Sequence, residues 1–112
     1  MHELFESLPP SWCVLDCYVR FLYHIGERSL PHSFIRIANK LKCGDARSLL
    51  SDQNTVFFLE VLLQRHVYGR PLELKQDVLL RESVLSILDK LVEVGSAASY
   101  RMRDDFVTPI SV

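Results

Sequence analysis

The chain has few glycines and none of the motifs that glycine builds. Its 112 residues include four glycines, at positions 26, 44, 69 and 95. They form neither a G-x-x-x-x-G-K-[ST] phosphate loop nor a G-x-G-x-x-G dinucleotide fingerprint, and no G-x-S-x-G nucleophile elbow is present. Each glycine follows an apolar helical pattern, where it is typical of a helix end. The sequence therefore carries no nucleotide-binding or serine-hydrolase signature.

The chain also lacks an excess of one charge. Lys and Arg number 13 and Asp and Glu number 14, for a net charge of -1, whereas a general polyanion binder needs a basic excess. No run of about 18 uncharged apolar residues occurs, so we expect no membrane insertion. The acidic start does not resemble a secretory signal, and three cysteines suit a reducing compartment better than a disulfide scaffold. We expect an intracellular protein, cytoplasmic or nuclear.

Apolar residues recur at helical spacing through most of the chain, without strand–helix alternation. The spacing predicts helices over residues 11–25, 31–42, 45–51, 53–68, 75–94 and 97–106. The clearest stripes are Phe34, Ile37, Ala38 and Leu41 in one helix, and Leu80, Val84, Ile87, Leu88 and Leu91 in another. We expect an all-α fold of five to six helices, with residues 1–112 forming a single helical domain.

Residues 79–106 join a long amphipathic helix to a short one through a Gly-Ser corner. The residues of this pattern are Leu88, Leu91, Val92, Gly95, Ser96 and Ala98. The stretch resembles the junction between consecutive armadillo or HEAT-type repeats. That resemblance implies a short helical array, or the terminal part of a longer α-solenoid, that acts as a non-catalytic scaffold and binds a peptide or helix in a groove. An irregular helical bundle is the alternative architecture.

The predicted helix 53–68 is apolar on almost all sides. Phe57 and Phe58 point about 100° apart around a helix, so one neighbouring helix cannot cover both. Either this helix is central in a bundle, or one side of it meets another protein. We predict an apolar groove for a partner helix or peptide, formed by Phe57, Phe58, Leu62 and the Leu80–Leu91 stripe.

Residues 28–47 contain five cations and one carboxylate, Asp45. The cations are Arg28, Arg36, Lys40, Lys42 and Arg47. Arg36 and Lys40 share a helix face at i, i+4. We expect these cations to form a basic rim that steers an acidic protein partner toward the groove. The alternative is a nucleic-acid-associated subunit that binds phosphates through the same patch, but we expect a protein partner, in a complex or an oligomer.

The cysteines and histidines offer weaker candidates. Cys13, Cys17 and His24 share one side of a predicted helix, but His24 lies about 10 Å beyond Cys17, too far to join the same ion. We therefore interpret Cys13 and Cys17 as small core residues and predict no metal or other cofactor. Cys43 lies at a predicted helix C-terminus, which disfavours a thiolate, and we interpret it as a partly buried structural thiol.

The run Arg-Met-Arg-Asp-Asp at 101–105 combines two cations with two carboxylates. We interpret it as a solvated helix end whose charges neutralise one another. Taken together, the patterns predict a binding protein and not an enzyme.

Overall fold

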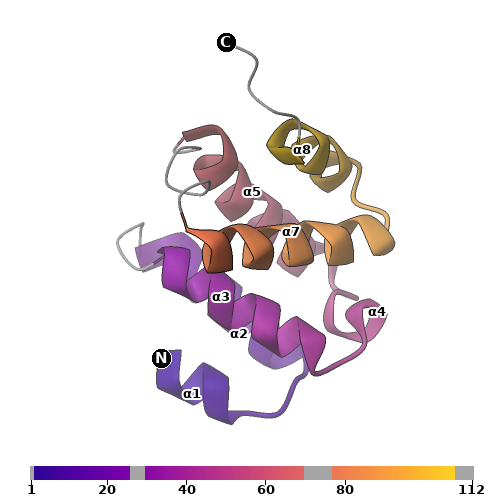
Figure 1. Cartoon of the computed structure of the whole chain (residues 1–112). Coiled ribbons are helices and arrows are strands. Elements are labelled where there is room, and N and C mark those ends of the chain that lie inside the picture. Colours follow the sequence, from indigo (N-terminus) through magenta and orange to yellow (C-terminus); the bar gives the residue numbers. More distant parts are fainter. Residues whose placement is uncertain (1, 26–29, 70–76, 108–112) are drawn as a thin grey trace.

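The computed structural model describes residues 2–25, 30–69 and 77–107, and within these ranges the chain is all-helical with no strand (Figure 1). The helices are α1 (His2–Ser7), α2 (Trp12–Ile25), α3 (Leu30–Lys42), α4 (Ala46–Leu49), α5 (Gln53–Gly69), α7 (Val78–Glu93) and α8 (Ala97–Val107). The all-α prediction is confirmed, although the described ranges hold seven helices instead of five to six. No helix among these residues is long and apolar enough to cross a membrane.

α1 is the helix that the sequence pattern did not predict. An isolated helix of six residues is not stable in water, so α1 depends on its contacts with the rest of the fold. Its Phe5 ring is buried and stacks on the ring of Tyr18 in α2, with centroids 3.9 Å apart. Pro9 and Pro10 then separate the two helices, because proline disfavours helical geometry before it and lacks an N–H group.

The apolar stripes of α3 and α7 meet in the core, to which the other described helices also contribute buried side chains. α3 packs along α7, α7 packs against α8, and α2 packs against α5 (Figure 1). The predicted stripes of α3 and α7 are buried throughout: Phe34, Ile37, Ala38 and Leu41 in α3, and Leu80, Val84, Ile87, Leu88 and Leu91 in α7. The periodicity of these two helices was therefore sufficient to identify the faces that meet.

α2 does not bury the side that carries its two cysteines. Leu15, Tyr18, Val19 and Leu22 are buried, whereas Cys13 and Cys17 are exposed. The sequence of α2 has apolar residues on two overlapping faces, and its packing against α1 and α5 selects between them. The interpretation of Cys13 and Cys17 as core residues is therefore wrong, and Cys43 is exposed as well.

The charged run at 101–105 reaches the neighbouring helices. Arg103 of α8 forms an ion pair with Asp89 of α7, and the hydroxyl of Tyr68 in α5 donates a hydrogen bond of 2.7 Å to Asp105. These contacts correct the interpretation of this run as self-neutralising, because two of its charges have partners on other helices. α8 is thereby attached to both α5 and α7.

Candidate functional site

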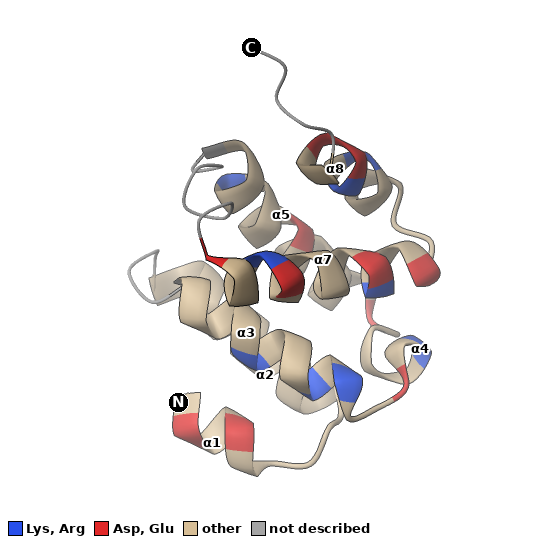
Figure 2. Ribbon diagram, in the orientation of Figure 1, with Lys and Arg blue, Asp and Glu red and all other residues tan. Residues whose placement is uncertain are grey.

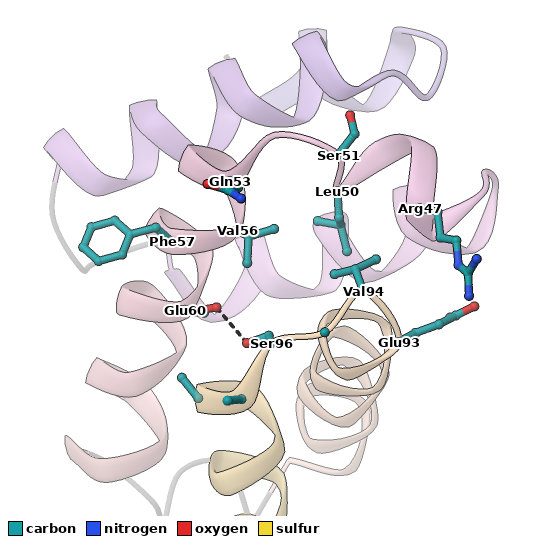
Figure 3. A pocket seen from close by; sticks show the side chains of 13 residues that line it. Arg47, Leu50, Ser51, Gln53, Val56, Phe57, Glu60, Glu93, Val94 and Ser96 are labelled. Atoms are coloured by element: carbon teal, nitrogen blue, oxygen red, sulfur yellow. Dashed lines mark hydrogen bonds between the residues drawn. The ribbon is translucent and has the colours of Figure 1, made fainter.

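An open pocket of about 880 Å³ lies where four helices meet (Figure 3). Its walls come from α4, the start of α5, the end of α7 and the start of α8. We call this pocket the corner groove. Its apolar lining consists of Leu50, Val56, Phe57, Val94, Ala97 and Ala98. Its charged lining consists of Arg47, Glu60 and Glu93.

The turn between α7 and α8 forms one wall of the corner groove. Gly95 has a φ of +94°, a conformation that L side chains rarely adopt. Its N–H group bonds the carbonyl of Val92, and the N–H group of Ser96 bonds the carbonyl of Leu91, each at 3.0 Å. This pair of bonds is the Schellman motif, which satisfies carbonyls at the end of a helix. The motif gives this wall of the groove a defined backbone geometry.

Ser96 connects this turn to α5. Its Oγ accepts a hydrogen bond of 3.1 Å from the N–H group of Ser99 and so caps the start of α8. The same hydroxyl donates a hydrogen bond of 2.7 Å to the Glu60 carboxylate across the groove (Figure 3). The Ser99 hydroxyl oxygen lies 2.8 Å from the Ser96 Oγ. These contacts hold the first turn of α8 beside the second turn of α5.

The charged side chains lie on different walls of the corner groove. Arg47 extends from α4 and points toward Glu93 at the end of α7 (Figure 3). Glu60 lies on the α5 wall, where it accepts the Ser96 hydrogen bond. Phe57 is 56% exposed, and its ring meets that of Phe58 edge to face, with centroids 5.8 Å apart. The groove therefore offers an apolar floor and charges of both signs, with the exposed Phe57 ring at its outer edge, directed away from Val94 and Ser96 (Figure 3).

Of the predicted apolar binding residues, the corner groove contains Phe57 alone. Phe58 is half-buried against the ring of Tyr23, with centroids 4.8 Å apart, and under the guanidinium of Arg20. Leu62 is 1% exposed. Leu62 of α5 belongs to the hydrophobic core. The Leu80–Leu91 stripe does not line a groove either, because α3 and α8 cover α7. These placements correct the predicted composition of the groove.

The predicted basic rim is also divided. Arg47 lines the corner groove and Lys42 is exposed at the end of α3, while Arg28 lies outside the described residues. Arg36 forms an ion pair of 2.7 Å with Glu6 of α1. Lys40 is buried and donates hydrogen bonds to backbone carbonyls of α1 and the residue after it. The prediction of one continuous rim is therefore wrong, because two of its cations bind the N-terminal helix.

Sequence reasoning missed Glu60, Glu93 and Ser96 as residues of a site. Glu93 belongs to a regular polar stripe and gave no separate signal. Ser96 belongs to the Gly-Ser corner of the sequence pattern, which gave no sign of its hydrogen bond to Glu60. Within the ranges described, no group of three or more His, Cys, Asp or Glu side chains is placed to hold a metal ion.

Comparison of the chain with protein-family models, with curated proteins and with solved structures finds no match. The functional interpretation therefore depends on the geometry of the corner groove.

Proposed function

We propose that this chain is a non-catalytic protein-interaction module that binds a short peptide or a partner helix in the corner groove. The observation that carries the proposal is the exposed ring of Phe57 beside the apolar floor of the groove. Burying a phenylalanine side chain contributes roughly 1.5–3 kcal/mol. Exposed aromatic residues at the edge of a pocket are typical anchors of protein interfaces.

The charges of the groove favour a ligand with a defined orientation. Arg47 suits an acidic residue of the ligand, as the sequence-based hypothesis of an acidic partner requires. Glu60 and Glu93 stand on other walls and suit a basic or hydrogen-bond-donating group. A ligand that carries both signs would thus bind in one direction better than in the reverse direction.

The frame of the groove supports binding without a large rearrangement. The Schellman turn at Gly95 and the hydrogen bonds of Ser96 hold α7, α8 and α5 in place. A groove that is already formed costs a ligand less ordering free energy than one that must assemble. The resemblance of residues 79–106 to an armadillo or HEAT-type corner supports the same kind of role, since such corners belong to peptide-binding scaffolds.

We do not extend the proposal to nucleic acid. That alternative needed Arg36 and Lys40 as free cations, and both contact α1. The remaining described cations of the stretch, Lys42 and Arg47, are two positive charges on a chain with net charge -1.

The experiment is a selection of peptides from a random display library on the full chain, followed by fluorescence anisotropy with the selected peptides. We expect Phe57→Ala to weaken binding about tenfold, which corresponds to about 1.4 kcal/mol, and Arg47→Glu to weaken it as well. Tyr100→Ala is the matched control, because Tyr100 is also 56% exposed and lies outside the groove. Arg81→Glu is the charge control on an exposed site of α7.

Peptides that bind the Phe57→Ala and Arg47→Glu proteins as tightly as the wild type would overturn the proposal. So would a selection that yields no binding peptide family.

A further inference from the structure

α1 is attached to the rest of the protein by a compact set of side-chain contacts. The Phe5 and Tyr18 rings are nearly parallel, at 8°, with centroids 3.9 Å apart. The Lys40 ammonium lies 5.1 Å from the centroid of the Phe5 ring, in cation–π geometry. The α1-docking surface therefore consists of Tyr18 from α2 together with Arg36 and Lys40 from α3.

The polar contacts match the chemistry of a helix end. Glu6 accepts a hydrogen bond of 2.7 Å from the guanidinium of Arg36. Lys40 donates to the carbonyl of Glu6 at 3.1 Å and to that of Leu8 at 2.6 Å. Carbonyls at the C-terminus of a helix lack helical partners and attract cations. Figure 2 shows the acidic residues of α1 beside the basic residues of α3.

The connection between α1 and α2 makes α1 a separable unit. Among the described helices, α1 packs mainly against α2 and α3. Pro9 and Pro10 follow it after Leu8, and such prolines favour an extended, stiff chain. Extending this connection therefore costs little conformational entropy, since the two prolines already restrict its backbone.

Exposed apolar surface surrounds this connection. Leu4, Leu8 and Trp12 are exposed large apolar residues. Leu4 and Leu8 border an almost entirely apolar depression of about 320 Å³, which also contains Cys13 and Cys17. In a dimer, the same exposed apolar residues of a second chain can cover this surface.

We propose that two copies of this chain form a dimer by exchanging α1. In that dimer the α1 of each copy occupies the α1-docking surface of the other, with the Phe5–Tyr18 stack and the Glu6–Arg36 pair formed between chains. The exchanged contacts are the same as those within one chain, so the docking surface is complementary to its new occupant. The dimer is favoured by rising protein concentration. This proposal does not depend on ligand binding in the corner groove, which shares no residue with the α1-docking surface.

The test uses two charge-reversed proteins, Glu6→Arg and Arg36→Glu. The first protein has arginine at both positions of the pair, and the second has glutamate at both. Like charges therefore face each other within each chain and in the exchanged dimer of either protein alone. In a mixture, the exchanged heterodimer restores an arginine opposite a glutamate at both sites. We expect native mass spectrometry of the mixture to show about fivefold more heterodimer than either homodimer. Circular dichroism of each protein establishes that it remains folded.

Two results would overturn the exchange. One is a mixture that stays monomeric up to the highest concentration at which the proteins remain soluble. The other is a heterodimer that persists undiminished when Phe5→Ala is added to both proteins, because that interface would not depend on α1.

A second measurement needs no substitution. Wild-type chains labelled with ¹⁴N and ¹⁵N are mixed, equilibrated and treated with a carbodiimide, which joins carboxylates to neighbouring amines. We expect cross-linked peptides that combine α1 of one isotope with α3 of the other, in amounts that rise with concentration. Cross-links between α1 and α3 of the same isotope alone, at every concentration, would contradict the exchange.

Discussion

The Lys40 ammonium lies 2.6 Å from the carbonyl oxygen of Leu8 and 3.1 Å from that of Glu6. Lys40 is 8% exposed, although its position opposite the apolar stripe of α3 indicated a cation of the basic rim. Its charge is satisfied by carbonyls that the end of α1 leaves without helical partners. A single lysine thus binds α3 to a segment more than 30 positions earlier in the chain.

The first prediction concerns this lysine. Lys40→Met keeps most of the apolar side chain but removes the hydrogen bonds to the α1 carbonyls. We expect the free energy of unfolding in urea to fall by about 1.5–3 kcal/mol, the usual contribution of hydrogen bonds from a charged group. Lys42→Met, on an exposed site of the same helix, should change the free energy of unfolding by less than about 0.5 kcal/mol. Equal losses in the two proteins would contradict this role of Lys40.

The second prediction concerns the turn at Gly95. An added Cβ would meet no atom within 4 Å, so the cost of Gly95→Ala comes from the backbone at φ +94°. We expect thermal unfolding to show a loss of about 1–2 kcal/mol for the alanine protein. Gly95→Asn should lose less, because asparagine tolerates positive φ better than alanine does. An alanine protein as stable as the wild type would show that the turn relaxes without cost.

The third prediction concerns the bond between Ser96 and Glu60. Ser96→Ala removes the cap of α8 and the donor to the Glu60 carboxylate, and we expect a loss of about 0.5–2 kcal/mol in the free energy of unfolding. A double-mutant cycle with Glu60→Ala separates the two effects, because only the hydrogen bond couples the residues. Strictly additive losses would mean that the bond itself contributes nothing to stability.

The fourth prediction concerns the pH dependence of stability. Burial lowers the pKa of His2 below its ordinary value of 6.5, Arg36 lowers it further, and Glu6 acts in the opposite direction. The His2 ring lies 2.6 Å from the Tyr18 hydroxyl. The folded protein therefore favours the neutral imidazole. The contribution of His2 to the stability of the fold is complete above pH 6.5 and is lost as the pH falls below that value.

The measurement is urea unfolding of the wild type and of His2→Gln at several pH values on both sides of 6.5. We expect the free energy of unfolding of the wild type to decrease more steeply toward acid than that of the variant. Parallel curves for the two proteins would exclude His2 as a source of the pH dependence.

The helix boundaries show how much of the structure is determined by residues close together in the sequence. Ser11 directly precedes α2, and its Oγ caps this helix by accepting a hydrogen bond of 3.2 Å from the N–H group of Val14. Asp77 caps α7 by accepting a bond of 3.0 Å from Leu80. The predicted start of this helix, residue 75, lies outside the described residues. Caps and periodic stripes were readable because they depend on residues three or four positions apart.

The corner groove was only partly predictable from the sequence. Phe57 was identified because an all-apolar helix leaves one aromatic ring without cover. Leu62, from the same helix, was placed in the groove although it is a core residue. The pattern alone does not distinguish them, since the side of α5 that stays open depends on where α2 and α8 pack.

By itself, the sequence determined the all-helical class, the buried stripes of α3 and α7, and most helix ends. These features follow from the preferences of each segment and from contacts within one or two helical turns. The tertiary structure alone decided that α1 forms, which face of α2 is buried, and that Arg36 and Lys40 bind α1. The physical reason is that a six-residue helix and a buried ammonium are each unfavourable in isolation, and become stable only when the fold brings them together.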